Sequence, residues 1–494
     1  MEQIRRAAKA KWLGRGTRNF TGRVCTNSTQ VQEGDLFVAL VGKKHDAHEY
    51  LPQVIAKGAS GLLVHRELPG GGDLLQQAQA GGVAVLQVED TTAGLNRLAA
   101  AYRAELRAKV IAVGGSNGKT TTKRIIHALL SEKYGAAGGH ASPKSFNNNI
   151  GMPLTLLEVE VSHEYVVLEI GTNAPGEIAA LGEVARPDIA VITNVGLEHL
   201  EKLGDLEGVA REEASIAPFV AETGGTLVLP AEAPELLACL RLSKSQRILV
   251  GKAGVGGGVN STGADLVLTD VQETVHGCTF TINGRGGYRL PLLGAHNALN
   301  ALMAIAVARR LGLSDEQIQA GLNKVTAAPM RLEMLQVGGH YVINDAYNAN
   351  PSSMAAALET FARLSLPAGL TGGSSNGGGE RGGRRVAILG DMLELGSASE
   401  AMHRNVGAQV AAWRIPVLIA VGPAMQTAAD AAANSGGVMV HRFTDTAMAR
   451  QGVAALLHPD EVILLKGSRG MALETILEAI GQTASRPSGR GAAQ

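Results

Sequence analysis

A lysine and a threonine at the end of a glycine-rich run carry the most specific chemistry in this sequence. Lys119 and Thr120 follow the run Gly114–Gly118. The apolar residues Val110–Val113 precede this run, and a helix-compatible segment, Thr121–Leu130, follows it. Glycines let backbone N–H groups approach phosphate oxygens, and a helix N-terminus favours their negative charge. Since the lysine would reach the outer phosphates and the threonine hydroxyl would face Mg²⁺, the run predicts a site for a nucleoside triphosphate with Mg²⁺.

The match to a phosphate loop is incomplete. The long form of the motif has a glycine five residues before Gly118, and this chain has Val113 there, so the loop has the shorter form G-x-x-G-K-[ST]. A glycine-rich turn before a helix is the structural alternative. We favour the phosphate loop because the strand, the loop, the Lys-Thr pair and the helix occur together in that order.

Two further residues lie where a metal–phosphate site would form. Glu169 lies at the end of the apolar run Tyr165–Ile170, and His199 follows the run Ile189–Asn194. The carboxyl ends of parallel strands meet at one edge of a sheet, where the sites of α/β proteins form. Alone, Glu169 is equally well explained as a surface acid at a strand end, and His199 is better explained as a loop histidine. Together with the phosphate loop they become candidate ligands of Mg²⁺, which prefers oxygen and keeps waters.

The composition favours a multidomain α/β protein. The chain has 494 residues, which suggests about three domains. The net charge is zero, so no basic excess points to nucleic acid. Cys25, Cys239 and Cys278 are widely spaced, which suits a reducing compartment without disulfides. The N-terminus lacks the apolar core of a signal peptide and no segment has the length of a membrane span, so we expect a cytoplasmic protein without membrane insertion.

Apolar runs that alternate with helix-like segments predict an α/β fold of three domains. We expect a small N-terminal α/β unit at 1–108 and a central phosphate-loop domain with a parallel sheet at 109–325. A C-terminal Rossmann-like α/β domain is expected at 326–482. The tail at 483–494 and the segment Gly372–Gly383 are rich in Gly, Ser and Arg and are predicted to be disordered.

Polar residues follow the predicted strands of the third domain. They are Asn344-Asp345, Gly390-Asp391 and Lys466–Arg469. Their shared position at strand ends predicts a second set of site residues, which faces the middle domain.

In combination, the motifs resemble the Mur ligases, ATP-dependent enzymes that form amide bonds in peptidoglycan synthesis. The resemblance starts with Gly115–Thr122 and continues with Glu169 and His199. Further stretches narrow it to the ligases that add D-alanyl-D-alanine to UDP-N-acetylmuramoyl-tripeptide, and the resemblance covers nearly the whole chain. These stretches are Lys144–Asn148, Ile150–Thr155, Asn344–Met354, Leu389–Gly396 and Leu465–Arg469.

The resemblance implies a reaction and its catalytic residues. ATP phosphorylates the terminal carboxylate of the UDP-linked tripeptide, and the amine of D-alanyl-D-alanine attacks the acyl phosphate, which leaves ADP and phosphate. Catalytic roles are implied for Lys119, Glu169 and His199, and Mg²⁺ ligation for Thr120, Glu169 and His199. We add Glu213 to both sets as a hypothesis, because it stands where the family has another residue.

Binding residues are also implied by the resemblance. The implied ATP contacts are Gly115, Ser116, Asn117, Gly118, Lys119, Thr120, Thr121, Asn297, Asn300, Arg331 and Asp345. The implied substrate contacts are Ser28, Asp46, His48, Ser145, Asn147, Asn148, Tyr347, Asn348, Asn350, Ser352, Lys466, Ser468 and Arg469. The first domain would bind the UDP part and the third domain would bind D-alanyl-D-alanine, so catalysis should need domain closure.

The sequence departs from the family pattern in three places. The family usually has a lysine, carbamylated on its amine, fourteen residues after the metal-binding histidine; here that position is Glu213, in a predicted helix at 205–220. We hypothesise that the Glu213 carboxylate replaces the carbamate, with Glu212 as a weaker alternative and a solvated helix acid as the structural one. Asn27–Thr29 stands where the family often has Asp-Ser-Arg, and Ala47 stands where glycine is common. The uridine contacts therefore stay open.

Two other functions remain alternatives. One is another amide ligase of the same superfamily, a different Mur step or a folylpolyglutamate synthetase-like enzyme, and the run Asn344–Pro351 argues against it. The other is a non-catalytic ATP-binding partner, which would not need polar strand ends in a third domain. We expect a monomer. Whether the third residue of the tripeptide is lysine or diaminopimelate, and how the domains are arranged at rest, stay open.

Overall fold

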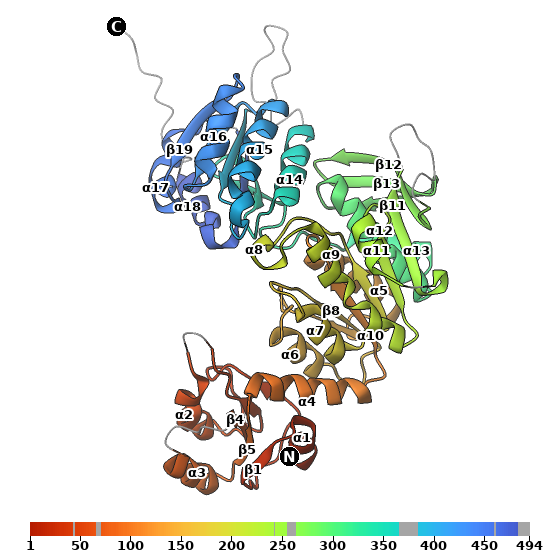
Figure 1. Ribbon diagram of the computed structural model, residues 1–494, viewed down its shortest axis with the longest axis vertical. Coiled ribbons are helices and arrows are strands. Elements are labelled where there is room, and N and C mark those ends of the chain that lie inside the picture. Colours follow the sequence, from red (N-terminus) through yellow and green to blue (C-terminus); the bar gives the residue numbers. More distant parts are fainter. Residues whose placement is uncertain are drawn as a thin grey trace.

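The chain folds into three domains, each built around its own sheet (Figure 1). The computed structural model describes residues 1–42, 45–65, 71–241, 243–253, 263–364, 384–458 and 461–482. The predicted disordered segments at 372–383 and 483–494 lie outside the described residues. The predicted fold class, α/β with three domains, is confirmed.

The N-terminal domain has a five-stranded sheet of order β1-β5-β4-β3-β2, in which β1 alone runs antiparallel to its neighbour. Its strands are β1 (Lys11–Gly14), β2 (Val24–Cys25), β3 (Leu36–Val38), β4 (Gly61–His65) and β5 (Ala84–Val88). Its helices are α1 (Glu2–Ala8), α2 (Leu51–Ala56), α3 (Gly71–Ala80) and α4 (Thr91–Glu105). Successive residues of β4 face opposite cores, Leu62 one and Leu63 the other, which is why the buried part of this strand, Gly61–Val64, is apolar.

The central domain has a nine-stranded sheet of order β14-β13-β12-β11-β10-β9-β6-β8-β7. The strands from β7 across the sheet to β12, including β6, all run parallel to one another. At the other side of β12, strands β13 and β14 continue the sheet in antiparallel pairs. The strands are β6 (Lys109–Gly114), β7 (Gly139–Ala141), β8 (Tyr165–Glu169), β9 (Ile189–Ile192), β10 (Thr226–Pro230), β11 (Arg247–Lys252), β12 (Leu266–Thr274), β13 (Gly277–Ile282) and β14 (Arg285–Leu290).

Helices cover both faces of the central sheet. They are α5 (Lys119–Tyr134), α6 (Gly151–Leu157), α7 (Glu177–Ala185), α8 (Leu200–Leu203), α9 (Leu206–Ala214), α10 (Ala217–Glu222), α11 (Pro234–Cys239), α12 (Ala295–Arg310) and α13 (Asp315–Asn323). One core lies between the sheet and α5 and α12, and a second core lies against α6, α7 and α9. The helix predicted at 205–220 is divided into α9 and α10, because Pro218 starts a new helix in the first turn of α10.

The third domain has a six-stranded sheet of order β15-β16-β20-β17-β18-β19, in which β15 is antiparallel and the other strands are parallel. Its strands are β15 (Glu333–Val337), β16 (His340–Asp345), β17 (Arg385–Gly390), β18 (Val417–Val421), β19 (Met439–Phe443) and β20 (Val462–Lys466). Its helices are α14 (Pro351–Arg363), α15 (Ser399–Ala412), α16 (Met425–Asn434), α17 (Thr446–Gly452) and α18 (Ile476–Gly481).

The domains follow one another along the molecule, with the central domain between the other two (Figure 1). Helix α4 carries the N-terminal domain onto α6 and α7, and the Asn96 side-chain amide donates to the carbonyl of Asn149 at 2.7 Å. The short helix α8 lies beside the third domain. None of the helices in the described ranges combines the length and apolar character that a membrane crossing requires.

Candidate active site

The glycine-rich loop runs from the end of β6 to the start of α5, as predicted. Gly115 and Gly118 have φ values of 108° and 82°, a region in which L side chains are strained. A Cβ atom on Gly115 would lie 2.3 Å from Oγ1 of Thr193 and 2.7 Å from its backbone nitrogen. The loop therefore needs glycine at Gly115 for both its conformation and its close approach to the end of β9.

The segment after β9 holds this loop in place. The N–H of Asn117 donates to Oδ1 of Asn194 at 2.8 Å, and the N–H of Ser116 donates to the carbonyl of Asn194 at 3.1 Å. The N–H of Gly196 donates to Oγ of Ser116 at 2.9 Å. Two adjacent strand ends thus fix one loop at the carboxyl edge of the sheet.

Glu169 and Thr120 form the oxygen-rich part of the site. The Thr120 hydroxyl donates to Oε2 of Glu169 at 2.9 Å, and the Asn147 amide donates to Oε1 at 3.2 Å. Glu169 is 1% exposed, and its charge is paired with the Lys123 ammonium group at 2.9 Å. Burial lowers the pKa of Lys123, and Glu169 opposes that shift.

The donor set suits Mg²⁺ as a partner of bound phosphates. A threonine hydroxyl and a carboxylate are the hard oxygen donors that Mg²⁺ prefers, and Mg²⁺ completes its shell with waters and phosphate oxygens. In the described part of the chain, no three His, Cys, Asp or Glu side chains come close enough to form a metal site by themselves. The residues fit a Mg²⁺ held jointly by protein and nucleotide rather than a preformed protein cage.

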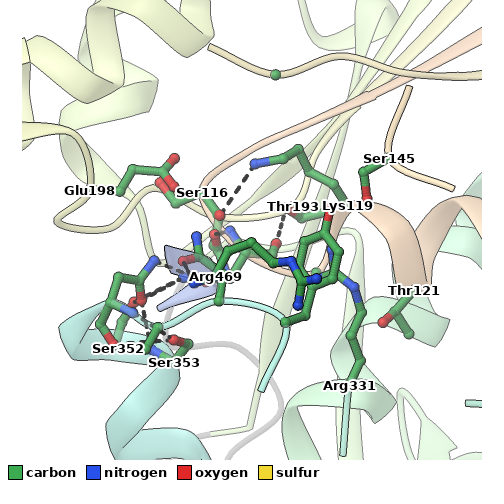
Figure 2. A pocket seen from close by; sticks show the side chains of 18 of the residues that line it. Ser116, Lys119, Thr121, Ser145, Thr193, Glu198, Arg331, Ser352, Ser353 and Arg469 are labelled. Carbon is green, nitrogen blue, oxygen red and sulfur yellow. Dashed lines mark hydrogen bonds between the residues drawn. The ribbon is translucent and has the colours of Figure 1, made fainter. Parts of the chain in front are cut away.

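A cavity of about 510 Å³ lies between the central and third domains. Figure 2 shows side chains of both domains, including Lys119, Glu198, Arg331 and Arg469, gathered around it. The predicted residues that line it are Ser116, Asn117, Gly118, Lys119, Thr121, Ser145, Asn147, Asn148, Glu169, His199, Asn297, Asn300, Arg331, Asp345, Tyr347, Asn348, Asn350, Ser352, Lys466, Ser468 and Arg469. Sequence positions more than 300 residues apart therefore meet in one space.

The start of α12 closes the cavity beside the phosphate loop. The Asn300 amide donates to Oδ1 of Asn297 at 3.0 Å, and the Asn297 amide donates to the carbonyl of Leu293 at 2.7 Å. A Cβ on Gly118 would lie 2.5 Å from Oδ1 of Asn300, so loop and helix are in close contact.

The third domain contributes a charged strand edge. The Lys466 ammonium group lies 2.6 Å from Oδ2 of Asp345, and donates to the carbonyl of Asn348 at 3.0 Å. Asp345 also accepts from the N–H of Leu332 at 3.1 Å, through Oδ1. These contacts hold together the ends of β16 and β20, which face the central domain.

Arginines extend this edge. The guanidinium of Arg331 lies 4.0 Å from the centroid of the Tyr347 ring, a cation–π contact that orients both side chains. Arg469 is paired with Glu474 at 2.7 Å. The Ser468 hydroxyl accepts from the N–H of Leu393 at 2.9 Å.

Two polar residues before α6 have structural partners as well as places in the lining. Asn148 Oδ1 accepts from the N–H groups of Ile150 and Gly151, at 3.1 and 2.9 Å, at the start of α6. The Ser145 hydroxyl lies 3.4 Å from that of Thr120.

Glu213 lies beneath the phosphate loop and is not part of the cavity lining. On α9 it is 1% exposed, and its Oε2 accepts from the N–H of Gly115 at 2.8 Å. Burial raises the pKa of Glu213 to about 8, against the opposing charge of Lys119. Its Oε1 is buried and has no hydrogen-bond partner among the described residues. The carboxyl group supports the loop backbone in this arrangement, and a metal role would require it to leave Gly115.

The neighbouring acid has a different structural role. Oε2 and Oε1 of Glu212 accept from the N–H groups of Gly176 and Ile178, at 2.7 and 2.8 Å, around the start of α7. Its charge thus stabilises the N-terminus of that helix.

The three predicted residues of the N-terminal domain lie away from the cavity. His48 is 6% exposed; its Nε2 accepts from the N–H of His65 at 2.9 Å, so its proton is on Nδ1, which lies 2.5 Å from Oδ1 of Asp46. The carbonyl of Ser28 accepts from the Lys57 ammonium group at 2.8 Å. The side chains of Asp46 and His48 therefore stabilise the backbone of the loop in which they lie.

Several lining residues were not predicted as site residues. They are Thr193, Asn194, Glu198, His296 and Glu394. Burial raises the pKa of Glu198 and lowers that of His296 to about 4. Glu394 lies inside the quoted run Leu389–Gly396, and Asn194 ends the predicted strand before His199, so the sequence marked their segments without assigning them a role.

Comparison with known proteins gives the family. The profile of the Mur ligase middle domain matches residues 113–308, and that of the Mur ligase glutamate ligase domain matches residues 330–469. The chain is 35% identical over 458 residues to the UDP-N-acetylmuramoyl-tripeptide–D-alanyl-D-alanine ligase of Bacillus subtilis, with 92% of each chain covered.

Solved structures agree with this relationship. The crystal structure of MurF from Acinetobacter baumannii superposes with a TM-score of 0.81 at 29% identity, over 97% of this chain and 98% of that one. MurF ligase from Thermotoga maritima, solved in complex with ADP, gives a TM-score of 0.76 at 25% identity, over 94% of this chain and 98% of that one. The resemblance seen in the motifs is confirmed: the chain belongs to the Mur ligase family, in the group of the UDP-N-acetylmuramoyl-tripeptide–D-alanyl-D-alanine ligases.

Proposed function

We propose that this chain is a cytoplasmic ATP-dependent ligase that joins D-alanyl-D-alanine to UDP-N-acetylmuramoyl-tripeptide. The observation that carries the proposal is a cavity in which the phosphate loop of the central domain faces the Lys466–Arg469 edge of the third domain. Its products would be the pentapeptide, ADP and phosphate, and it would act as a monomer.

The reaction has two steps. An oxygen of the tripeptide carboxylate attacks the γ-phosphorus of ATP, and the bond to the bridging oxygen breaks as ADP leaves. The amine of D-alanyl-D-alanine then attacks the acyl carbon, loses a proton, and expels phosphate with the electron pair of the C–O bond. A carboxylate is a poor electrophile, so the protein must mainly position the reactants and neutralise charge.

The central domain would bind the nucleotide. Lys119 would exchange its contacts with the Gly115 and Ser116 carbonyls for the outer phosphates, and the loop N–H groups would face phosphate oxygens. Asn297 and Asn300 would lie at the adenine and ribose of the nucleotide. Arg331 and Asp345 would contact ATP from the third domain.

Thr120, Glu169 and His199 would hold Mg²⁺, which neutralises phosphate charge when it is bound. The structural support is the Thr120–Glu169 contact at 2.9 Å and the place of His199 in the cavity lining together with Glu169. We retain Glu213 as a candidate carboxylate for a second ion. That role requires Glu213 to break its hydrogen bond to Gly115.

The other residues would bind the two substrates. Ser145, Asn147 and Asn148 would contact the tripeptide end, and Ser28, Asp46 and His48 the UDP end in the N-terminal domain. The third-domain residues, which would contact D-alanyl-D-alanine, are Tyr347, Asn348, Asn350, Ser352, Lys466, Ser468 and Arg469.

The deciding experiment measures phosphate release by the full chain with ATP, Mg²⁺ and UDP-N-acetylmuramoyl-tripeptide, with and without D-alanyl-D-alanine. Both tripeptides, with lysine and with diaminopimelate, are tested, and the product mass is recorded. Release that needs both substrates and gives the pentapeptide mass supports the proposal. ATP binding without acceptor-dependent turnover would point to a non-catalytic partner, and turnover with other acceptors would point to another amide ligase.

A further inference from the structure

His199 and Glu394 meet across the interface between the central and third domains. Nδ1 of His199 lies 2.6 Å from Oε2 of Glu394, and both residues line the cavity. The side chains are 18% and 59% exposed, respectively. A contact between an imidazole and a carboxylate this exposed contributes at most about 1 kcal/mol, so stability alone is a weak reason for the contact.

The backbone on both sides of this contact is strained. His199 has φ of 50° and Glu394 has φ of 63°, the left-handed region that non-glycine residues rarely adopt. Such residues persist only where surrounding structure holds them, and they concentrate at functional sites. Here two of them face each other from different domains.

The loop after β17 presents Glu394 from a fixed position. The N–H of Met392 donates to Nε2 of His403 at 3.0 Å. The N–H of Leu393 donates to Oγ of Ser468 at 2.9 Å. His403 is fully buried and Ser468 is 3% exposed, so the two residues before Glu394 are tied to the interior of the third domain.

A carboxylate on one nitrogen of an imidazole decides what the other nitrogen can do. A carboxylate oxygen 2.6 Å from Nδ1 of His199 favours the tautomer with the proton on Nδ1, and in that tautomer the lone pair of Nε2 is free. Metal-binding histidines almost always give their other N–H to a carboxylate, a carbonyl or a water, and that contact fixes both tautomer and ring orientation.

We propose that Glu394 is a positioning residue of the ligase reaction, which accepts the Nδ1 proton of His199 and so prepares Nε2 to bind a divalent cation. The inference rests on the proposed function. The carboxylate of Glu394 belongs to the third domain, and His199 belongs to the central domain. The central domain therefore obtains a correctly oriented ligand only when the third domain is docked.

A second contact supports the same docked arrangement. The Asn117 amide donates to Oγ of Ser352 at 2.9 Å, and the Asn350 amide donates to Oδ1 of Asn117 at 3.0 Å. The third domain thus touches the phosphate loop directly while it orients His199.

The first test measures the affinity of the full chain for Mn²⁺, used as a paramagnetic substitute for Mg²⁺, in the presence of ADP. Free Mn²⁺ is followed by electron paramagnetic resonance for the wild type, Glu394→Gln, Glu394→Ala and the control Glu400→Gln. Glu400 is an exposed acid of the same domain that pairs with Arg404 on its own helix. We expect Glu394→Ala to weaken the lower-affinity Mn²⁺ site about 10- to 100-fold. Glu394→Gln should lose less Mn²⁺ affinity, because its amide oxygen can still accept a hydrogen bond from Nδ1. Glu400→Gln should bind Mn²⁺ with wild-type affinity.

A wild type with one Mn²⁺ site only, or a Glu394→Ala variant with wild-type affinity at both sites, would overturn the proposal. Spectra of ¹⁵N-histidine-labelled protein at pH 8 separate a positioning role of Glu394 from a purely structural one, because they report the tautomer of His199. The His199 signal is assigned as the one missing in His199→Gln. The Nδ1–H tautomer is expected in the wild type and the Nε2–H tautomer in Glu394→Ala. An unchanged tautomer would contradict the inference.

Neither measurement uses turnover. Absence of acceptor-dependent phosphate release would therefore count against the proposed function, and unchanged Mn²⁺ affinity and tautomer would count against Glu394 alone.

Discussion

Lys119 directs its ammonium group at its own loop. Nζ contacts the carbonyl of Gly115 and lies 3.3 Å from that of Ser116 (Figure 2). These neutral acceptors are weaker partners than phosphate oxygens, because the negative charge of a phosphate adds a Coulombic attraction to the ammonium group that a carbonyl lacks. The lysine is therefore ready to exchange them for a nucleotide.

Replacing Lys119 with methionine should lower kcat/KM for ATP about 10²- to 10³-fold, since it removes a charge that faces the transferred phosphate. Phosphate release at varied ATP gives the value. The control is Lys324→Met, which removes an exposed lysine paired with Glu132 and should keep wild-type kinetics. A loss smaller than threefold in Lys119→Met would mean that the loop binds phosphate without it.

Glu213 should make stability depend on pH. Its folded-state pKa of about 8 lies above the ordinary value of 4.5, so the folded protein binds the proton more tightly than the unfolded chain. Stability from this group is therefore present below pH 4.5 and is lost as the pH rises toward 8, by up to about 1.4 kcal/mol per pH unit. Glu213→Gln should flatten that decline relative to the wild type in urea unfolding at pH 5, 6.5 and 8. Parallel curves would show that Glu213 is ionised in the folded protein.

The same residue makes a prediction about bicarbonate. A carboxylate encoded in the sequence needs no carbon dioxide, so wild-type turnover should not rise when bicarbonate is added to degassed enzyme. The comparison is Glu213→Lys, whose activity should be low and should rise with bicarbonate. Strong stimulation of the wild type would contradict the replacement of a carbamylated lysine by Glu213.

At the scale of elements, the loop between β6 and α5 depends on Gly115. Gly115→Ala adds both a strained φ and a Cβ only 2.7 Å from the backbone nitrogen of Thr193, which cannot move without disturbing β9. Gly135, at the end of α5, is a matched control, because it has φ of 79° but nothing within 4 Å of an added Cβ. We expect Gly135→Ala to cost about 1 kcal/mol of unfolding free energy and Gly115→Ala at least about 2, with loss of ADP binding. Equal costs in urea unfolding would mean that the loop relaxes around the methyl group.

The part of the site around Lys119 and Glu169 could be predicted, because residues that are consecutive in the sequence form it. The strand, loop and helix around Lys119, and the strand ending at Glu169, are written in consecutive residues, and α/β topology places strand ends together. The antiparallel strands β1 and β15 and the division of α9 from α10 were less visible, because they depend on which neighbour a short segment finds. The His199–Glu394 contact was not predicted for the same reason: nothing near either residue in the sequence specifies how two domains dock. The sequence marked Glu213 as a departure from the family pattern, but its hydrogen bond to Gly115 depends on how α9 packs beneath the loop.

At the scale of the whole molecule, docking of the third domain rests on a few polar contacts around a large cavity. Removing the Ser352 hydroxyl leaves the Asn117 amide without one acceptor, so Ser352→Ala should shift the docked fraction by about 1 kcal/mol, roughly fivefold. Cys239 is exposed on the central domain while Cys25 and Cys278 are buried, so energy transfer between dyes on Cys239 and on Glu400→Cys reports docking. The control is Ser435→Ala, whose hydroxyl donates to the carbonyl of Ala431 at the C-terminal end of α16, inside the third domain. Equal transfer distributions in Ser352→Ala and the control would mean that this contact does not hold the domains together.

The antiparallel extension of the central sheet also affects how copies of the molecule behave in a crowded solution. A sheet edge can pair with another chain, and a protein of zero net charge has little long-range repulsion to prevent it. Edge strand β14 carries exposed Arg285 and Arg289 with two exposed glycines between them, and β7 at the opposite edge has only three residues. Positive charges and short length both discourage edge-to-edge aggregation. Colloidal stability is thus supplied locally, at the sheet edges, in a molecule whose overall charge cannot supply it.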